Sequence, residues 1–254
     1  LKNKEKVVMI IQARMGSTRF PQKSMKELCG EPLITRILER VKRCENLDEI
    51  VLAIPDTKEN MVLEEIGRIN NVKVFKGSEN DLVERYYLAA LKYEADYVCR
   101  LPADNAAPEP KEIDKIIDFH ISLKKPGFSS NLAQINGSGY PDGIGTEIFD
   151  FSLLKQIQAK ESNPEKREHV HLNFYCYVSD KPVDMAWCPV NTIKCPSEYS
   201  RPDLVLDINT EEQFNFIKEM YEYLYPKKPK FTIVDIVDWY DNTYTKKVKN
   251  EQIS

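Results

Sequence analysis

Three basic side chains, Arg14, Arg19 and Lys23, lie in a short segment that also carries a glycine and hydroxyl groups. The segment follows an apolar run at residues 7–11, which is typical of a strand buried on both faces of a mostly parallel sheet. Such sheets bind ligands where strands pass into loops. The glycine permits close backbone approach, exposed N–H groups attract anions, and the cations neutralise phosphate charge. Residues 12–23, hereafter the phosphate loop, therefore predict a binding site for the phosphates of a nucleotide.

The same residue types would suit a basic surface loop that binds nothing, but the surrounding pattern favours a binding site. A turn at residues 28–30 leads into apolar residues that recur at helical spacing from Leu33 to Val41, so the loop joins a strand to a helix. The chain has no Gly-x-x-x-x-Gly-Lys-Ser/Thr sequence, and its first strand-to-helix turn has no Gly-x-Gly-x-x-Gly. The first absence excludes a P-loop kinase or ATPase, and the second argues against a dinucleotide-binding oxidoreductase.

Two aspartates, Asp104 and Asp207, follow the apolar runs at residues 97–101 and 204–206, which are typical of strands. Because strand ends in an open α/β sheet meet at one crevice, we expect both carboxylates to lie beside the phosphate loop. Magnesium prefers oxygen ligands and commonly shares its shell with water and substrate phosphates. The two aspartates therefore predict a magnesium site. A turn or helix-cap carboxylate is the alternative for each.

Strand-like runs alternate with amphipathic helical segments, which predicts a one-domain α/β protein. Between residues 163 and 200, helix and strand signals are mixed and prolines interrupt any long element. The expected strands are residues 7–11, 50–54, 72–75, 97–101, 128–132, 146–149 and 204–206. The expected helices are residues 33–41, 59–69, 81–93, 152–159, 210–224 and 232–240, and His120 lies on a further one.

Composition narrows the class of protein. The net charge of −4 argues against a general nucleic-acid binder, which needs a strongly basic face. The six cysteines are scattered without a Cys-x-x-Cys pair, so we expect reduced thiols. No apolar run is long enough to span a bilayer, and no secretory leader precedes the first strand. These features predict a cytoplasmic protein with no membrane partner.

The phosphate loop resembles the opening signature of the spore-coat polysaccharide type of cytidylyltransferase-like proteins, which are relatives of the acylneuraminate and 3-deoxy-manno-octulosonate cytidylyltransferases. The resemblance continues through residues 75–87, 140–143, 167–170 and 206–207. It implies a Rossmann-like three-layer fold with a mostly parallel sheet, of the nucleotide-diphospho-sugar transferase type. It also implies a single catalytic domain over residues 1–254 and a homodimer formed through an arm within residues 163–200.

The chemistry that the resemblance implies is transfer of CMP from CTP to a small acidic sugar, with release of pyrophosphate and with Mg²⁺ as cofactor. Asp104 and Asp207 would bind the metal. The residues expected in catalysis are Arg14, Arg19, Lys23 and Asp104. Those expected to bind the nucleotide are Gln12, Ala13, Arg14, Met15, Gly16, Ser17, Arg19, Lys23, Ser78, Asp81, Arg85 and Asp104.

The acceptor is expected at a glycine-rich flap, residues 138–147, which combines flexible turns with donors and acceptors suited to a polyol. A glycine-rich hairpin turn is the alternative. Within the flap, Asp142 and Glu147 are candidates for binding a hydroxyl group or for the base. The residues expected to bind the acceptor are Tyr140, Asp142, Gly143, Glu147, Arg167 and His169.

One departure from the family pattern keeps other functions open. Relatives carry a glycine just before the aspartate at Asp104 and a proline two residues after it, where this chain has Ala103 and Ala106. A noncatalytic nucleotide-binding regulator is therefore an alternative. A glycosyltransferase that uses a nucleotide sugar is another, although the usual Asp-x-Asp is absent at Asp104. A metal hydrolase would need His169 and His171 as ligands, but their spacing supplies only two.

Overall fold

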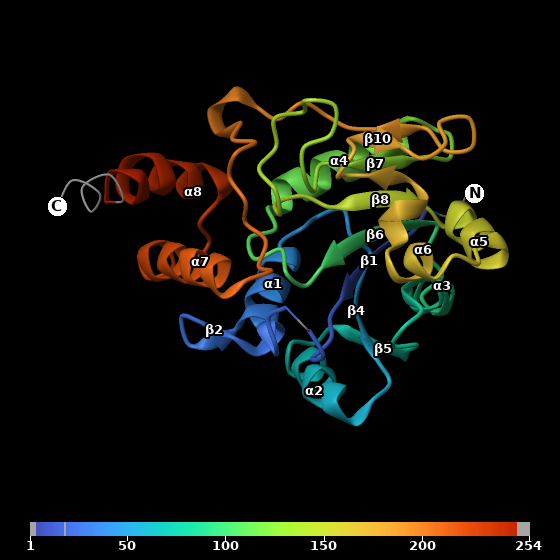
Figure 1. Cartoon of the computed structure of the whole chain (residues 1–254), viewed down its shortest axis with the longest axis horizontal. Coiled ribbons are helices and arrows are strands. Elements are labelled where there is room, and N and C mark those ends of the chain that lie inside the picture. The colour runs from blue at the N-terminus through green and yellow to red at the C-terminus, as the bar shows by residue number, and fades with distance from the viewer. Residues whose placement is uncertain (1–3, 18, 248–254) are drawn as a thin grey trace.

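The structure, a computed structural model, describes residues 4–17 and 19–247. Within these ranges seven strands form one sheet in the order β11-β7-β8-β6-β1-β4-β5 (Figure 1). The strands β6, β1, β4 and β5 are parallel, β8 runs antiparallel to both β6 and β7, and β11 runs parallel to β7. Their bounds are β1 (Val7–Gln12), β4 (Glu49–Pro55), β5 (Lys73–Gly77), β6 (Tyr97–Pro102), β7 (Phe128–Ser130), β8 (Glu147–Asp150) and β11 (Val190–Asn191).

Helices cover both faces of the sheet, which confirms the predicted three-layer architecture (Figure 1). The helices α1, α2, α4, α7 and α8 contribute to one hydrophobic cluster, and α3 and α5 contribute to the other. Their bounds are α1 (Leu33–Val41), α2 (Met61–Ile69), α3 (Leu82–Lys92), α4 (Pro110–Ser122), α5 (Phe151–Lys160), α7 (Glu211–Leu224) and α8 (Ile233–Trp239).

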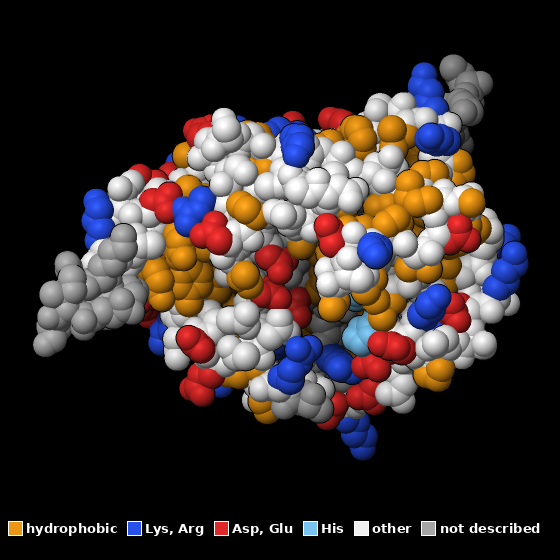
Figure 2. All heavy atoms as spheres, turned by 45° about the horizontal axis from the view of Figure 1, so that its top comes forward, with side chains coloured by type: hydrophobic (Ala, Val, Ile, Leu, Met, Phe, Trp, Pro, Cys, Tyr) orange, Lys and Arg blue, Asp and Glu red, His pale blue; other side chains and the backbone are white. Residues whose placement is uncertain are grey.

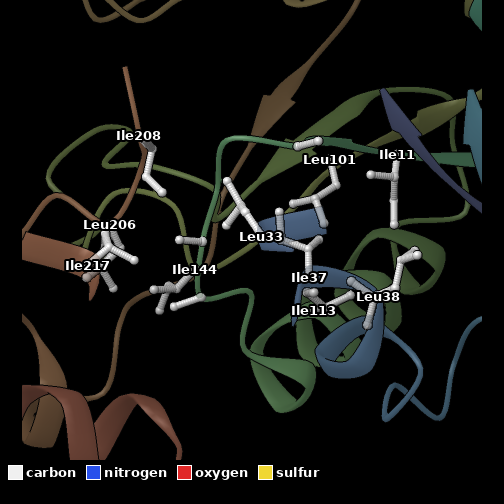
Figure 3. Packing of buried hydrophobic residues seen from close by; sticks show 14 of the residues in the cluster. Ile11, Leu33, Ile37, Leu38, Leu101, Ile113, Ile144, Leu206, Ile208 and Ile217 are labelled. Atoms are coloured by element: carbon white, nitrogen blue, oxygen red, sulfur yellow. The ribbon is translucent and has the colours of Figure 1, made fainter. Parts of the chain in front are cut away.

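The continuous apolar sequence of β1 accounts for its central place. Side chains alternate across a strand, so Met9 and Ile11 enter one cluster while Val8 and Ile10 enter the other, and all four are fully buried. Figure 3 shows Ile11 and its neighbours on the sheet near the apolar face of α1. The central strand is therefore fixed from both sides, and the loop that follows it begins from a rigid position.

The segment at residues 204–206 is not a strand of the sheet, so the expectation of a strand there is wrong. Leu204 and Leu206 are buried and Val205 is exposed, which explains the strand-like alternation. Among the residues that the structure describes, this segment and the adjacent Asp207 form only the isolated bridges Asp142↔Val205 and Asn105↔Asp207, because their neighbours are loops and not strands. The extended backbone nevertheless brings residue 207 beside the loop that follows β6.

Residues 163–200 contain short elements. Helix α6 (Pro164–Glu168) and a 3₁₀ turn (Val170–Asn173) precede a hairpin of β9 (Tyr175–Cys176) and β10 (Lys181–Pro182), and the chain then returns to the sheet edge as β11. The remaining short elements are β2 (Glu27–Leu28), β3 (Glu31–Pro32), the 3₁₀ turns Lys23–Met25, Lys58–Asn60 and Ser197–Tyr199, and the π-turn Tyr240–Tyr244.

A search for helices long and apolar enough to cross a membrane finds none in the described part of the chain.

Candidate functional site

A cleft of about 440 Å³ opens where β1 and β6 end, and charged side chains of both signs gather around a hollow on this face (Figure 2). The structure brings together in its lining most of the residues that the sequence predicted. These are Gln12, Ala13, Arg14, Ser17, Arg19, Lys23, Arg85, Asp104, Asp142, Glu147, His169 and Asp207.

The phosphate loop is attached to the rest of the cleft through Lys23. The Nζ atom of Lys23 donates to Oδ2 of Asp104 at 2.8 Å and to the carbonyl oxygen of Ile208 at 3.0 Å. Arg14 reaches solvent, with its guanidinium 3.9 Å from the exposed Glu168. Arg19 is exposed. The three predicted cations therefore line one cleft, with Lys23 fixed at its base and the two arginines facing solvent.

The loops that carry Asp104 and Asp207 are joined by backbone hydrogen bonds. The N–H of Ile208 donates to the carbonyl of Asp104 at 2.9 Å, and residues 105 and 207 form a β-bridge. One oxygen of Asp207 accepts from the Asn209 side-chain amide at 2.6 Å, whereas the other is buried without a partner among the described residues. Burial and the charge of Asp104 raise the pKa of Asp207. An unpartnered carboxylate oxygen beside a second carboxylate is a suitable set of donors for a hard cation.

Asp142 completes an acidic group in the cleft. Its backbone forms two hydrogen bonds with the segment at residues 204–206. The N–H of Asp142 donates to the carbonyl of Leu204, and the N–H of Leu206 donates to the carbonyl of Asp142, each at 2.9 Å. Burial, followed by the charges of Asp207 and Asp104, raises the pKa of Asp142 to about 7. A carboxyl group with this pKa exchanges a proton near neutral pH.

A buried ion pair that the sequence analysis did not predict forms the floor of the cleft. Arg100 and Glu147 are opposite one another in the β6–β8 register and lie 2.7 Å apart. The other oxygen of Glu147 accepts from the Tyr177 hydroxyl at 2.9 Å. An arginine inside the apolar strand 97–101 was the available signal for this pair. Its partner comes from the antiparallel strand β8, and that pairing follows only from the topology.

Both histidines of the 169–171 segment line the cleft, but they do not form a metal centre. Their ring centroids are 5.9 Å apart. Burial and the nearby Arg100 lower the pKa of His171 to about 3, so its imidazole is neutral at physiological pH. Within residues 4–17 and 19–247, no group of three or more potential His, Cys, Asp or Glu ligands is close enough to hold a metal. The structure therefore gives the metal-hydrolase alternative no support.

Several predicted residues lie outside the cleft lining and hold its walls in place. Asp81 caps α3 by accepting from the N–H of Glu84, and it pairs with Arg167 at 2.6 Å. Tyr140 is fully buried, and its hydroxyl donates to Glu112 at 2.5 Å. The other predicted residues absent from the lining are Met15, Gly16, Ser78 and Gly143. A role for any of these residues at the ligand stays a prediction.

Gly143 has a φ of +92°, and an added Cβ would lie 3.0 Å from the Leu206 carbonyl carbon. A side chain at this position would clash with the segment that carries Asp207, so glycine allows the flap to pack directly on it.

Arg85, which was expected to bind the nucleotide, is buried in the cleft lining. Arg85 donates to the Ser78 carbonyl at 3.1 Å, and burial lowers its pKa to about 10. Its Nε has no partner among the described residues.

Ala103 and Ala106, where the chain departs from the family pattern, are buried, and no residue from 100 to 108 has a positive φ. Alanine therefore fits the turn without left-handed strain.

The chain resembles known proteins in both sequence and structure. The family model described as cytidylyltransferase matches residues 8–226. The chain is 29% identical over 223 residues to the spore coat polysaccharide biosynthesis protein SpsF of Bacillus subtilis, covering 85% of this chain and 86% of that protein. It is 28% identical over 112 residues to a 3-deoxy-manno-octulosonate cytidylyltransferase of Geobacter metallireducens, covering 44% of this chain and 43% of that protein.

Two solved structures share the fold. A cytidylyltransferase from Leptospira borgpetersenii superposes with a TM-score of 0.83 at 28% identity, covering 95% of this chain and 96% of that chain. A CMP:2-keto-3-deoxy-manno-octonic acid synthetase complexed with CTP superposes with a TM-score of 0.63 at 17% identity, covering 87% of this chain and 100% of that chain.

Proposed function

Since this chain belongs to the cytidylyltransferase family, we propose that it transfers CMP from CTP to an acidic sugar and releases pyrophosphate, for the synthesis of a surface polysaccharide or glycan. One observation carries the proposal: the phosphate-loop cations and the carboxylates of Asp104 and Asp207 line the same cleft. A nucleoside triphosphate needs such an arrangement, because its negative charge must be neutralised while the α-phosphorus stays open to attack.

The identity of the nucleotide and of the acceptor is supported by relatives. The synthetase that shares this fold was determined with CTP, and a curated relative is a 3-deoxy-manno-octulosonate cytidylyltransferase. The name of SpsF supports a role in polysaccharide synthesis.

In the proposed reaction an acceptor hydroxyl oxygen bonds to the α-phosphorus of CTP. The bond from that phosphorus to the oxygen bridging the β-phosphate breaks, and pyrophosphate leaves with the electron pair. Negative charge on the phosphoryl oxygens must be held more strongly in the transition state than in bound CTP. Arg14, Arg19 and Lys23 supply this stabilisation from the phosphate loop.

Asp142 is the better candidate to accept the hydroxyl proton. Glu147, the other acid considered for this role, already accepts from Arg100 and Tyr177. Asp142 lines the cleft with a carboxyl pKa of about 7, which suits proton transfer near neutral pH.

The residues of the cleft fit magnesium. The unpartnered oxygen of Asp207 and the neighbouring Asp104 supply hard carboxylate ligands, and water and phosphate oxygens commonly complete such a shell. Bound magnesium would neutralise charge on the triphosphate. Lys23 donates to one oxygen of Asp104, so this carboxylate is positioned beside a cation.

Pyrophosphate release with each of the four nucleoside triphosphates, a panel of acidic sugars and magnesium tests the proposal. We expect CTP to be preferred and a CMP-linked product to form. Asp104→Asn and Arg19→Ala should each lower kcat/KM by about 100-fold, corresponding to about 3 kcal/mol of lost transition-state stabilisation. Arg68→Ala is the matched control, because Arg68 is exposed on α2 and lies outside the cleft.

Three results would contradict the proposal. Turnover by both cleft variants at the parent rate would remove their assigned roles. CTP binding without pyrophosphate release under any condition would identify a noncatalytic regulator. A product made by sugar transfer from a nucleotide sugar would identify a glycosyltransferase.

A further inference from the structure

A second cavity, of about 240 Å³, lies between α1 and the segment that joins α7 to α8. We call it the α1–α7 cavity. None of its lining residues is shared with the catalytic cleft. The lining combines arginines of α1 and of the turn that follows it with tyrosines at the end of α7 and with the loop after it. The lining residues are Arg36, Glu39, Arg40, Arg43, Tyr221, Tyr225, Pro229, Lys230 and Phe231.

Two of the four cations in this lining are already neutralised. Arg36 lies 2.8 Å from Glu39, and the buried Arg40 lies 3.4 Å from Glu109, which is also buried. Arg36 also donates to the Tyr225 hydroxyl and to the carbonyls of Leu28 and Cys29, and Arg40 donates to the carbonyls of Pro108 and Phe231. These two guanidiniums hold the walls of the cavity in place.

The other two cations have no such compensation. The Nη2 atom of Arg43 is buried and has no hydrogen-bond partner in the described part of the chain. Burial and the neighbouring charge of Arg40 lower the pKa of Arg43, so its guanidinium lies in an environment that disfavours a cation. Lys230 is exposed at the cavity and forms no salt bridge with any described residue. A buried donor beside a second cation costs stability unless an anion satisfies it.

The walls of the cavity are aromatic, which favours a flat ligand. The Arg36 guanidinium lies 4.1 Å from the ring centroid of Tyr225, and that of Arg40 lies 4.6 Å from the centroid of Phe231. Tyr221 stands edge-on to Phe231 at 5.1 Å. The rings and guanidiniums are thus ordered before any ligand arrives, which lowers the entropic cost of binding.

We propose that the α1–α7 cavity is a second anion site, which binds a compact phosphate monoester that carries a ring. Two uncompensated cations match the charge of a phosphate monoester near neutral pH better than that of a monocarboxylate. Guanidinium groups bind phosphate oxygens in a forked geometry, and the aromatic walls would contact the ring.

The contacts of the cavity connect it with the catalytic cleft. The hydroxyl of Tyr221 donates to the Ala106 carbonyl at 2.7 Å, and Nε of Arg40 donates to the Pro108 carbonyl at 2.8 Å. Both carbonyls belong to the loop that carries Asp104. An anion that moves Arg40 or Tyr221 would therefore alter the position of Asp104, so the site is placed to regulate nucleotide binding.

Calorimetry with phenyl phosphate as the probe tests binding without depending on turnover. We expect Arg43→Gln to weaken the Kd for phenyl phosphate by at least tenfold. Lys42→Gln is the matched control, because it removes the same charge one residue earlier on the exposed surface and does not line the cavity; its Kd should change less than twofold. Benzoate has the ring without the dianion and inorganic phosphate lacks the ring, so both should bind more weakly.

Steady-state kinetics tests the coupling. Phenyl phosphate should change the KM for CTP in the parent protein and should have no effect on it in Arg43→Gln. If phenyl phosphate instead competes with CTP at the phosphate loop, its effect on the KM for CTP will persist in Arg43→Gln, and that result would overturn the coupling. Equal binding of phenyl phosphate by the parent and Arg43→Gln, or binding lost in Arg19→Ala and kept in Arg43→Gln, would overturn the site itself.

Discussion

At the scale of single residues, the proposed function assigns different roles to the charged side chains of the cleft. In the proposed function, the arginines and the lysine of the phosphate loop bind the nucleotide, whereas Asp142 and the Glu147–Arg100 pair face the acceptor. The charge of Arg100 is balanced by the fully buried carboxylate of Glu147. A buried pair of this kind costs desolvation energy, so its value lies in the geometry that it fixes at the floor.

Glu147→Gln should therefore destabilise the protein, because it leaves the Arg100 charge buried without its counter-ion. The expected loss in the free energy of unfolding is about 3 kcal/mol, measured by urea denaturation. Glu65→Gln is the control, since Glu65 pairs with Arg68 on the exposed face of α2, and we expect no measurable change there. An unchanged denaturation midpoint for Glu147→Gln would show that the pair does not hold the floor.

At the scale of elements, the start of α7 positions the carboxylate of Asp207. Thr210 accepts from the N–H of Gln213, and the Gln213 side chain accepts in return from the N–H groups of Thr210 and Asn209. Asn209 then donates to Asp207 at 2.6 Å. Thr210 and Gln213 thus form a capping box, which connects a helix terminus with a predicted metal ligand.

Removal of the cap should weaken the helix without disturbing the core. Thr210→Ala is expected to lower the free energy of unfolding by about 1 kcal/mol, because the N–H of Gln213 loses its acceptor. Thr210→Ser keeps a hydroxyl at the same position and should retain most of the stability. Chemical denaturation of the three proteins provides the measurement, and equal stability of the alanine variant would rule out a contribution from the cap.

At the scale of the whole molecule, the segment at residues 163–200 is where we expect a second copy of the chain to bind. Around the β9–β10 hairpin, the apolar residues Val178, Val183 and Met185 are exposed, at 100%, 43% and 52% respectively. Apolar side chains gathered on one projecting segment are typical of an interaction surface. This agrees with the dimer arm that the family resemblance implies.

Light scattering after size-exclusion chromatography measures the predicted dimer. We expect a mass of two chains for the parent protein. Val178→Asp combined with Met185→Glu should shift the mass toward one chain, because charges would replace the apolar contacts. Met61→Glu, at an exposed apolar residue of α2, is the control and should leave the mass unchanged. A single-chain mass for the parent would contradict the predicted homodimer.

The sequence by itself determined the sheet core, most helices and most of the cleft. Residues 7–11 predict a buried central strand because every residue is apolar, and the position of the phosphate loop follows from that strand. Asp104 was likewise predictable, since a residue directly after a strand of a parallel sheet lies at the ligand-binding edge.

Only the tertiary structure decided what depends on pairing between distant segments. The partner of Arg100 follows from the antiparallel register of β8, which no local pattern encodes. Residues 204–206 have the alternation of a strand, yet they lie against loops, because burial of alternate side chains does not require a neighbouring strand. The α1–α7 cavity is also a tertiary feature, since its arginines come from α1 and the turn after it, and its aromatic walls come from segments about 180 residues later in the chain.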